Sequence, residues 1–160
     1  MPGDPLYDSD FYTWTQRQAE LVQESGDNRL DKEHLAEEVA DLGRSELRAC
    51  EGHLLQALIH LIKLVMSERD DPRGHWSSEV GLQLDQAQKA FSPGMRQHIE
   101  LDTLWGKAVK FANQQLGDYD DPHVPADLPC PFTLDQLLAP DFEPANARAR
   151  IERAIQARDA

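Results

Sequence analysis

The sequence is poor in several features that mark common classes of protein. Its 160 residues include two cysteines, Cys50 and Cys130, which lie far apart in the chain. Such a pair makes neither a metal motif nor a redox motif, so we expect reduced thiols in a cytoplasmic protein, with Cys50 a small core residue. The apolar runs are short, which predicts no membrane span, and the N-terminus has neither the basic region nor the apolar core of a signal peptide.

The chain also lacks the short motifs of several functional classes. It has no glycine-rich phosphate loop, no Gly-x-Ser-x-Gly elbow for a nucleophile, and no basic patch with interleaved aromatic residues. The acidic loop at residues 118–123 lacks the ligand spacing and the terminal glutamate of a calcium-binding hand. The sequence therefore offers no motif for any of these activities.

Basic residues are scarce as well. Sixteen Lys and Arg stand against 29 Asp and Glu, which gives a formal net charge of −13. This balance argues against direct binding to nucleic acid and to an anionic membrane surface, because both need basic groups. A basic protein partner, mimicry of nucleic-acid charge and the plain solubility of an acidic surface are the alternatives, and solubility is the favoured interpretation.

What the sequence does contain is a strong helical periodicity over residues 31–66. The first half of this segment is amphipathic and charged, and residues 54–66 are apolar over about half of the helix circumference. Its apolar residues recur at intervals of three and four, interrupted only at Gly43: Leu35, Val39, Leu47, Cys50, Leu54, Leu58, Leu61 and Val65. We expect this stripe to face the core and the long helix to organise the fold, with a kink favoured at Gly43 or Gly52.

Three further principal helices are predicted. The first runs over residues 9–24 with Ser9 as its cap, and its expected inner stripe is Phe11, Trp14, Gln18, Leu21 and Val22. The next begins at Ser77 or Ser78, and the last runs from Pro93 to Leu116. Together they predict an all-α protein of one domain over residues 1–160, with an antiparallel four-helix bundle over residues 9–116 as its core.

The chain changes character after the bundle. Four prolines between residues 122 and 131 forbid a continuous helix, so residues 117–143 are predicted to form an extended strap that ends in a short helix capped by Thr133. Phe132 and the leucines that follow it are too apolar for solvent, and we expect them to dock on the bundle. Residues 144–160 are predicted to form a charged helix that packs weakly.

Four segments of this sequence carry a family resemblance. They are Tyr7-x-x-Asp10-Phe11-Tyr12-x-Trp14, Leu35-Ala36-Glu37-Glu38-Val39-x-Asp41-Leu42-Gly43-Arg44-Ser45-Glu46, His60-Leu61-x-Lys63 and Cys130-Pro131-Phe132-Thr133-Leu134-x-Gln136-Leu137-Leu138. Over roughly residues 7–142 the chain resembles the bacterial domain-of-unknown-function family 29. The resemblance implies an all-helical, mostly prokaryotic and cytoplasmic protein. It implies no activity, substrate or catalytic residue.

One polar face of the long helix is a candidate for chemistry. At 100° per residue, His34, Glu38 and Asp41 fall within an arc of about 60°, together with Ser45. His98 and Asp102, four residues apart on the predicted fourth helix, could complete a divalent-metal site. The alternative is a solvated face, with His98 and Asp102 satisfying each other. No cofactor is expected, because the chain lacks the Glu-x-x-His motifs of dimetal bundles.

A second stripe lies beside this face. It consists of Glu37 and Asp41 followed by Arg44 and Arg48, with opposite charges three and seven residues apart. Pairs of this kind stabilise a helix by a few tenths of a kcal/mol each, so a structural ion-pair network is the favoured interpretation. The alternative is a ligand face in which Arg44 clamps an anion.

Three functional hypotheses follow from these patterns. The first is a non-enzymatic helical interaction or regulatory module in the cytoplasm, acting on a protein partner or on a second copy as a homodimer. The second is a metal-dependent bundle enzyme built on the His34 face. The third is an inhibitor that mimics the charge of nucleic acid. The sequence identifies no partner, substrate or oligomeric state.

Overall fold

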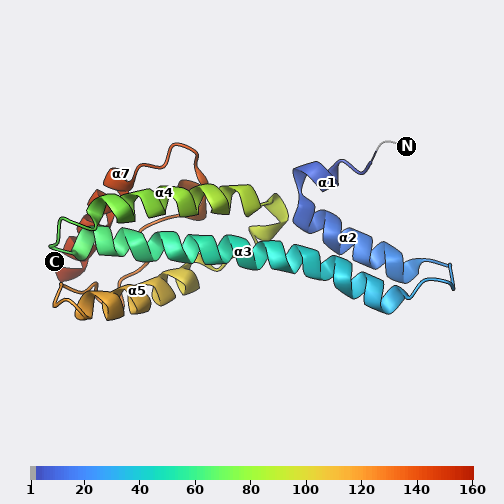
Figure 1. Ribbon diagram of the computed structural model, residues 1–160, viewed down its shortest axis with the longest axis horizontal. Coiled ribbons are helices and arrows are strands. Elements are labelled where there is room, and N and C mark those ends of the chain that lie inside the picture. Colours follow the sequence, from blue (N-terminus) through green and yellow to red (C-terminus); the bar gives the residue numbers. More distant parts are fainter. Residues whose placement is uncertain (1–2) are drawn as a thin grey trace. The chain divides into compact units, whose positions relative to one another are not determined.

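The computed structural model describes residues 3–160, and every regular element in this range is helical (Figure 1). The elements are α1 (Leu6–Ser9), α2 (Phe11–Glu24), α3 (Lys32–Met66), α4 (Arg73–Ala90), the 3-10 helix η1 (Pro93–Met95), α5 (Leu101–Gly117), α6 (Leu134–Leu138) and α7 (Pro144–Asp159). The prediction of an all-α protein with one long helix, a proline-rich strap and short C-terminal helices is confirmed.

The chain forms two compact units that share α3. The first unit comprises residues 1–50, as far as they are described, and residues 90–99. The second comprises residues 51–89 and 100–160. Of the four principal helices, α2 therefore belongs to the first unit, α4 and α5 belong to the second, and α3 contributes to both.

In the first unit, α2 runs antiparallel beside the first half of α3 to form a helical hairpin (Figure 1). The seam of this hairpin is made of small residues. Ala36, Ala40 and Gly43 are buried on α3, and Thr15 is fully buried on α2. A Cβ atom on Gly43 would overlap the Thr15 hydroxyl oxygen and lie 3.3 Å from Thr15 Cβ. Gly43 is thus a packing residue, and α3 continues through it as one helix.

Asp10 fastens η1 to the start of α2. Its carboxylate caps α2 by accepting hydrogen bonds from the Thr13 N–H at 3.2 Å and the Thr13 hydroxyl at 2.7 Å, and it also accepts from the Gly94 N–H at 3.1 Å. The Tyr12 N–H donates to the Ser92 hydroxyl at 3.1 Å. Burial raises the pKa of Asp10, but these hydrogen bonds outweigh it and hold the pKa below its usual value.

In the second unit, the second half of α3 lies between α4 and α5 (Figure 1). This part of α3 is apolar on its inner side, and the side chains there are excluded from solvent. The buried residues of the three helices are Leu54, Ala57, Leu58, Ile59, Leu61 and Ile62 on α3, Trp76, Val80, Leu84 and Ala87 on α4, and Leu104, Trp105, Ala108, Val109, Ala112 and Leu116 on α5. Cys50, the last residue of α3 that belongs to the first unit, is fully buried, as predicted.

The strap docks in the second unit, as the sequence predicts. Phe132 is 6% exposed and its ring meets Trp105 edge to face, with ring centroids 6.2 Å apart. The Trp105 indole N–H donates to the Leu128 carbonyl at 2.7 Å, and Leu137 of α6 is buried. Helix α7 packs more firmly than expected, because Ile151 is fully buried.

The inner stripe predicted for the first unit is wrong in part. Leu21 and Leu35, both placed inside, are 49% and 42% exposed, and Val39 is only half-buried. The buried positions lie one residue further along α3, at Ala36 and Ala40. The predicted and the observed stripes have the same spacing. The stripe of small residues is buried because small side chains let the backbones of α2 and α3 approach closely.

Three helix starts also differ from the prediction. The cap of α2 is Asp10 and not Ser9, and α4 begins earlier, at Arg73. The largest difference concerns the predicted helix from Pro93 to Leu116, which begins only at Leu101 as α5. Residues 93–95 form η1 instead, because Asp10 and Tyr12 of the α2 start hold this stretch through hydrogen bonds.

By length and composition α3 could also cross a membrane. A single helix of this kind is weak evidence for a membrane span, because core helices of soluble proteins pass the same test, and 44% of its most apolar window is buried inside the protein.

Candidate functional site

The structure places the predicted metal face on the exposed side of α3. His34 Nδ1 lies 2.7 Å from Asp31 Oδ2, and both side chains are exposed. This hydrogen bond to Asp31 raises the pKa of His34, because it favours the protonated imidazole. His34 therefore interacts with the residue that precedes α3, which the sequence interpretation did not pair with it.

The second half of the predicted metal site is not on one helix. His98 precedes α5, and its ring contacts Tyr12, with ring centroids 5.2 Å apart. Asp102 lies in the first turn of α5. The prediction that His98 and Asp102 form a pair four residues apart on the fourth helix is therefore wrong. Within residues 3–160, no three His, Cys, Asp or Glu side chains are grouped closely enough to hold a metal ion.

The neighbouring charged stripe contains an ion pair. Arg44 Nε donates to Asp41 Oδ1 at 2.8 Å, with both side chains nearly half exposed. Arg44 and Glu37 also line a shallow groove of about 350 Å³ between α2 and α3, while Arg48 is exposed on the same helix. The groove floor is the small seam of Ala36 and Ala40.

We expect the Asp41→Asn protein to lose less than about 1 kcal/mol of unfolding free energy, because an exposed ion pair contributes little. Chemical denaturation of both proteins measures this loss, and elemental analysis of the purified proteins tests the metal hypothesis. We expect both proteins to be free of stoichiometric metal. Zinc, iron or manganese present at one equivalent and lost in Asp41→Asn would contradict this and favour the metal-dependent enzyme.

The opposite side of the hairpin carries large apolar side chains. Leu21 of α2 is 49% exposed, and Leu35 and Leu42 of α3, one heptad apart, are 42% and 54% exposed. Glu37 and Arg44 line the polar groove on one side of the α3 seam, and at 100° per residue Leu35 and Leu42 lie on the other side. We call the surface formed by Trp14, Leu21, Leu35, Val39 and Leu42 the apolar face.

An aromatic cluster continues the apolar face at the start of α2. Tyr7 meets Trp14 edge to face, with ring centroids 4.9 Å apart, and Phe11 stacks on Trp14 at 5.6 Å. Tyr7 itself is 53% exposed. Within the described chain, five of the eight exposed large apolar side chains belong to the first unit, although this unit has fewer than half of the residues. The uncovered apolar surface is therefore concentrated there.

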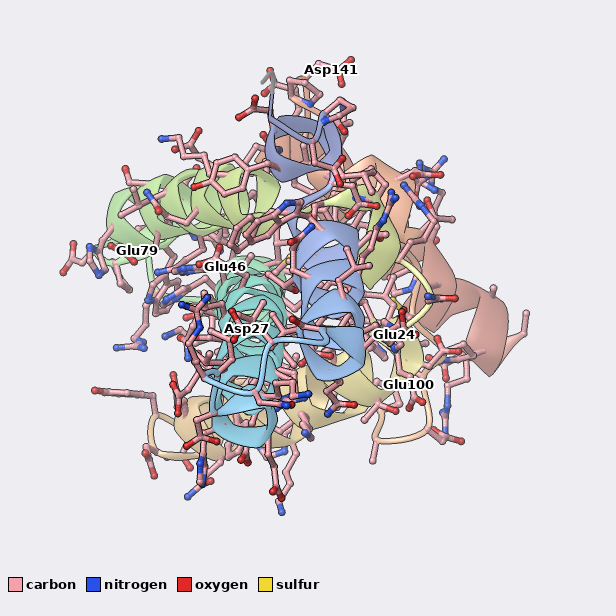
Figure 2. All side chains as sticks on the ribbon, turned by 90° about the vertical axis from the view of Figure 1, so that its right-hand side faces the viewer. Glu24, Asp27, Glu46, Glu79, Glu100 and Asp141 are labelled. Carbon is pink, nitrogen blue, oxygen red and sulfur yellow. The ribbon has the colours of Figure 1, made fainter. Side chains whose placement is uncertain are left out.

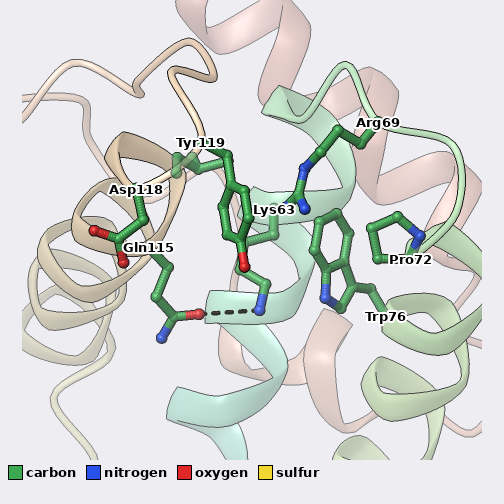
Figure 3. Close-up of a pocket in the computed structure, with 8 residues that line it drawn as sticks. Lys63, Arg69, Pro72, Trp76, Gln115, Asp118 and Tyr119 are labelled. Atoms are coloured by element: carbon green, nitrogen blue, oxygen red, sulfur yellow. Dashed lines mark hydrogen bonds between the residues drawn. The ribbon is translucent and has the colours of Figure 1, made fainter.

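A second feature lies in the second unit, where two cations and two aromatic rings meet (Figure 3). Lys63 of α3, Arg69 of the following loop, Trp76 of α4 and Tyr119 after α5 line a pocket of about 350 Å³. Lys63 Nζ lies 4.8 Å from the centre of the Trp76 ring, and Arg69 Cζ lies 3.6 Å from the centre of the Tyr119 ring. We call this the basic pocket.

Sequence reasoning did not identify the basic pocket. Its residues come from separate elements, and no spacing rule connects them. The one available signal was Lys63, an ionisable residue beside the most apolar stretch of α3, within the segment His60-Leu61-x-Lys63.

The two cysteines give no nucleophile. Cys50 is fully buried in the core. Burial raises the pKa of the Cys130 thiol to about 11, which outweighs the Cys130 hydrogen bond to the Phe132 carbonyl. At neutral pH this thiol is protonated and therefore unreactive.

Comparison with known proteins places this architecture among helical proteins without an assigned activity. Residues 6–143 match the family model described as domain of unknown function DUF29. A crystal structure of an alpha-helical protein of unknown function from Rhodospirillum rubrum is similar, with a TM-score of 0.84 and 28% sequence identity. The match covers 92% of this chain and 98% of that chain. No curated protein matches the sequence.

Proposed function

This chain belongs to the family described as domain of unknown function DUF29, and we propose that it is a non-enzymatic helical interaction module. Its apolar face receives a basic amphipathic helix of a partner protein. The observation that carries the proposal is the choice of buried residues in the α2–α3 hairpin. The small residues Ala36, Ala40 and Gly43 are buried, and the large apolar residues Leu35 and Leu42 are exposed.

Leaving large apolar side chains exposed forgoes the stabilisation that their burial would give, unless a partner covers them. Full burial of one leucine contributes about 1.5 to 3 kcal/mol, and the hairpin leaves Leu21, Leu35 and Leu42 about half exposed. Their spacing along α3 follows the heptad that a docked helix would contact. A helix laid over the apolar face would bury these side chains and so supply the energy of association.

The charge around the apolar face determines which helix fits. Residues 1–50 carry twelve Asp and Glu against five Lys and Arg. On α3, Glu38 and Glu46 stand three or four residues from the exposed leucines and are themselves exposed. Figure 2 shows Glu24 on α2 and Glu46 on α3, with Asp27, which pairs with Arg29, on the connecting loop. An acidic rim around an apolar centre is complementary to a helix with a basic polar face.

The same charges disfavour a second copy of this chain as the occupant. A symmetric pair would bring two acidic rims together, and like charges across an interface are repulsive. The proposed module acts in the cytoplasm, without direct contact to nucleic acid or membrane, since both of these partners are anionic.

The test is titration of the full chain with a synthetic helical peptide of Lys and Leu, about five turns long, with leucines at intervals of three and four. We expect binding that the double substitution Leu35→Gln and Leu42→Gln weakens at least about tenfold, because two apolar contacts are lost. Fluorescence anisotropy of a labelled peptide measures the affinity. Leu82→Gln on α4 is the matched control, since Leu82 is 51% exposed in the second unit.

Two comparisons make the experiment decisive. A peptide of the same composition with scrambled leucines tests whether charge alone causes binding, and equal binding of both peptides would overturn the proposal. Analytical ultracentrifugation tests whether a second copy of this chain occupies the apolar face. Self-association that Leu42→Gln abolishes, with no peptide binding, would assign the apolar face to a homodimer instead.

A further inference from the structure

We propose that the basic pocket of the second unit binds a small aromatic oxyanion, with the phosphate or carboxylate group held by Lys63 and Arg69. This site is independent of the apolar face and of any partner helix. It is built from three helices and a loop of the second unit, and its cavity of about 350 Å³ is in the size range of small-molecule sites.

The two cations of the basic pocket are only partly satisfied by the protein. Lys63 Nζ donates to Gln115 Oε1 at 3.0 Å, which leaves further N–H donors of this ammonium group for a ligand (Figure 3). Arg69 Nε lies 3.5 Å from Asp121 Oδ2, and it has no hydrogen-bond partner within the described residues. Both side chains are therefore positioned by their surroundings without being fully paired.

Within the described residues a carboxylate pairs with only one of these cations, because Asp121 lies beside Arg69 and no ion pair involves Lys63. Asp121 is buried, and it accepts hydrogen bonds from the Ser67 hydroxyl at 2.9 Å and the Glu68 N–H at 3.2 Å. Asp118 lines the pocket, but Figure 3 shows its carboxylate directed away from Lys63 and Arg69. In a chain with a net charge of −13, two cations held together in one pocket are unusual.

The electrostatics of the neighbouring groups agree with this geometry. Burial and the charge of Arg69 lower the pKa of Lys63. Burial and the charge of Lys63 lower the pKa of His60, one turn earlier on α3. An anion bound between Lys63 and Arg69 would relieve the repulsion between them.

The walls of the pocket indicate that the ligand also carries a ring. Pro72, Trp76 and Tyr119 supply apolar and aromatic surface beside the cations. Tyr119 is 60% exposed although Arg69 covers one face of its ring, so ring surface is left for a ligand to contact. A compact oxyanion on an aromatic ring matches both the cations and these walls.

Isothermal titration calorimetry of the full chain with phenyl phosphate, benzoate, inorganic phosphate and benzyl alcohol tests the proposal. We expect the aromatic anions to bind, inorganic phosphate to bind at least tenfold more weakly, and benzyl alcohol not to bind. The tighter of phenyl phosphate and benzoate identifies the preferred acidic group. Lys63→Met should weaken the binding of the aromatic anions at least tenfold, since it removes a cation and keeps most of the unbranched side chain.

Lys110→Met, an exposed lysine of α5 outside the pocket lining, is the matched control and should leave the affinity unchanged. Thermal melting verifies that each variant is folded, and Arg69→Gln provides a second loss of charge. Several results would overturn the proposal: no binding of either aromatic anion at millimolar concentration, equal binding of benzyl alcohol, equal binding of inorganic phosphate, or unchanged affinity in folded Lys63→Met.

Discussion

Replacing Phe132 by alanine is expected to lower the free energy of unfolding by about 3 to 5 kcal/mol, the usual cost of truncating a buried aromatic ring. The ring is 6% exposed and contacts both Trp105 and Phe142, each with ring centroids 6.2 Å away. Alanine would leave a cavity between the strap and the helices that these rings join. Urea denaturation followed by circular dichroism measures the loss.

Phe111→Ala provides the matched control for this prediction. Phe111 lies on α5 in the same unit and is 41% exposed, so its truncation should cost far less than that of Phe132. Equal losses for the two variants, or an unchanged stability of Phe132→Ala, would show that the strap does not contribute to the core.

The strap could be predicted from the sequence because two local signals agree there. Its prolines forbid regular structure, and the apolar residues from Phe132 to Leu138 require a surface to cover them. The structure adds the hydrogen bonds that place the strap. Asn113 of α5 donates to the Val124 carbonyl at 2.8 Å and accepts from the Val124 N–H at 2.9 Å. These residues are eleven apart, and no sequence rule pairs them.

The hairpin seam could not be predicted for a different reason. A search for apolar residues at helical spacing selects Leu35 and Val39, since their side chains are large, and passes over Ala36 and Ala40. Which stripe is buried depends on how closely the partner helix approaches, and that depends on Thr15 and other residues of α2. The apolar face depends on the same packing, because its leucines are exposed only when the small residues of α3 are the ones that face α2.

The basic pocket illustrates a further limit of sequence reasoning. Lys63 and Trp76 are 13 residues apart and Tyr119 follows much later, yet all three line one cavity. The metal hypothesis relied instead on residues close in sequence, and such residues share a helix face without converging on a point. His34 instead interacts with Asp31, its nearest available carboxylate.

Gly43→Leu is expected to lower the free energy of unfolding by about 2 kcal/mol, and Gly52→Leu to raise it by about 1 kcal/mol. Both glycines lie within α3, and replacing a helical glycine by leucine contributes about 1 kcal/mol through helix propensity. A Cβ on Gly52 meets nothing within 4 Å, so this gain is realised in full.

At Gly43 the gain is outweighed by the overlap of the new side chain with Thr15. Thr15 cannot turn away, because it is β-branched and its hydroxyl donates to the Tyr12 carbonyl at 2.7 Å. We therefore expect overpacking to cost about 3 kcal/mol, the upper end of its usual range. Adding Thr15→Ala should recover part of the loss in Gly43→Leu while changing Gly52→Leu only additively. If both leucine variants instead gain equally in stability, α2 and α3 do not pack closely at Gly43. Close packing would then no longer explain why Leu35 and Leu42 are exposed.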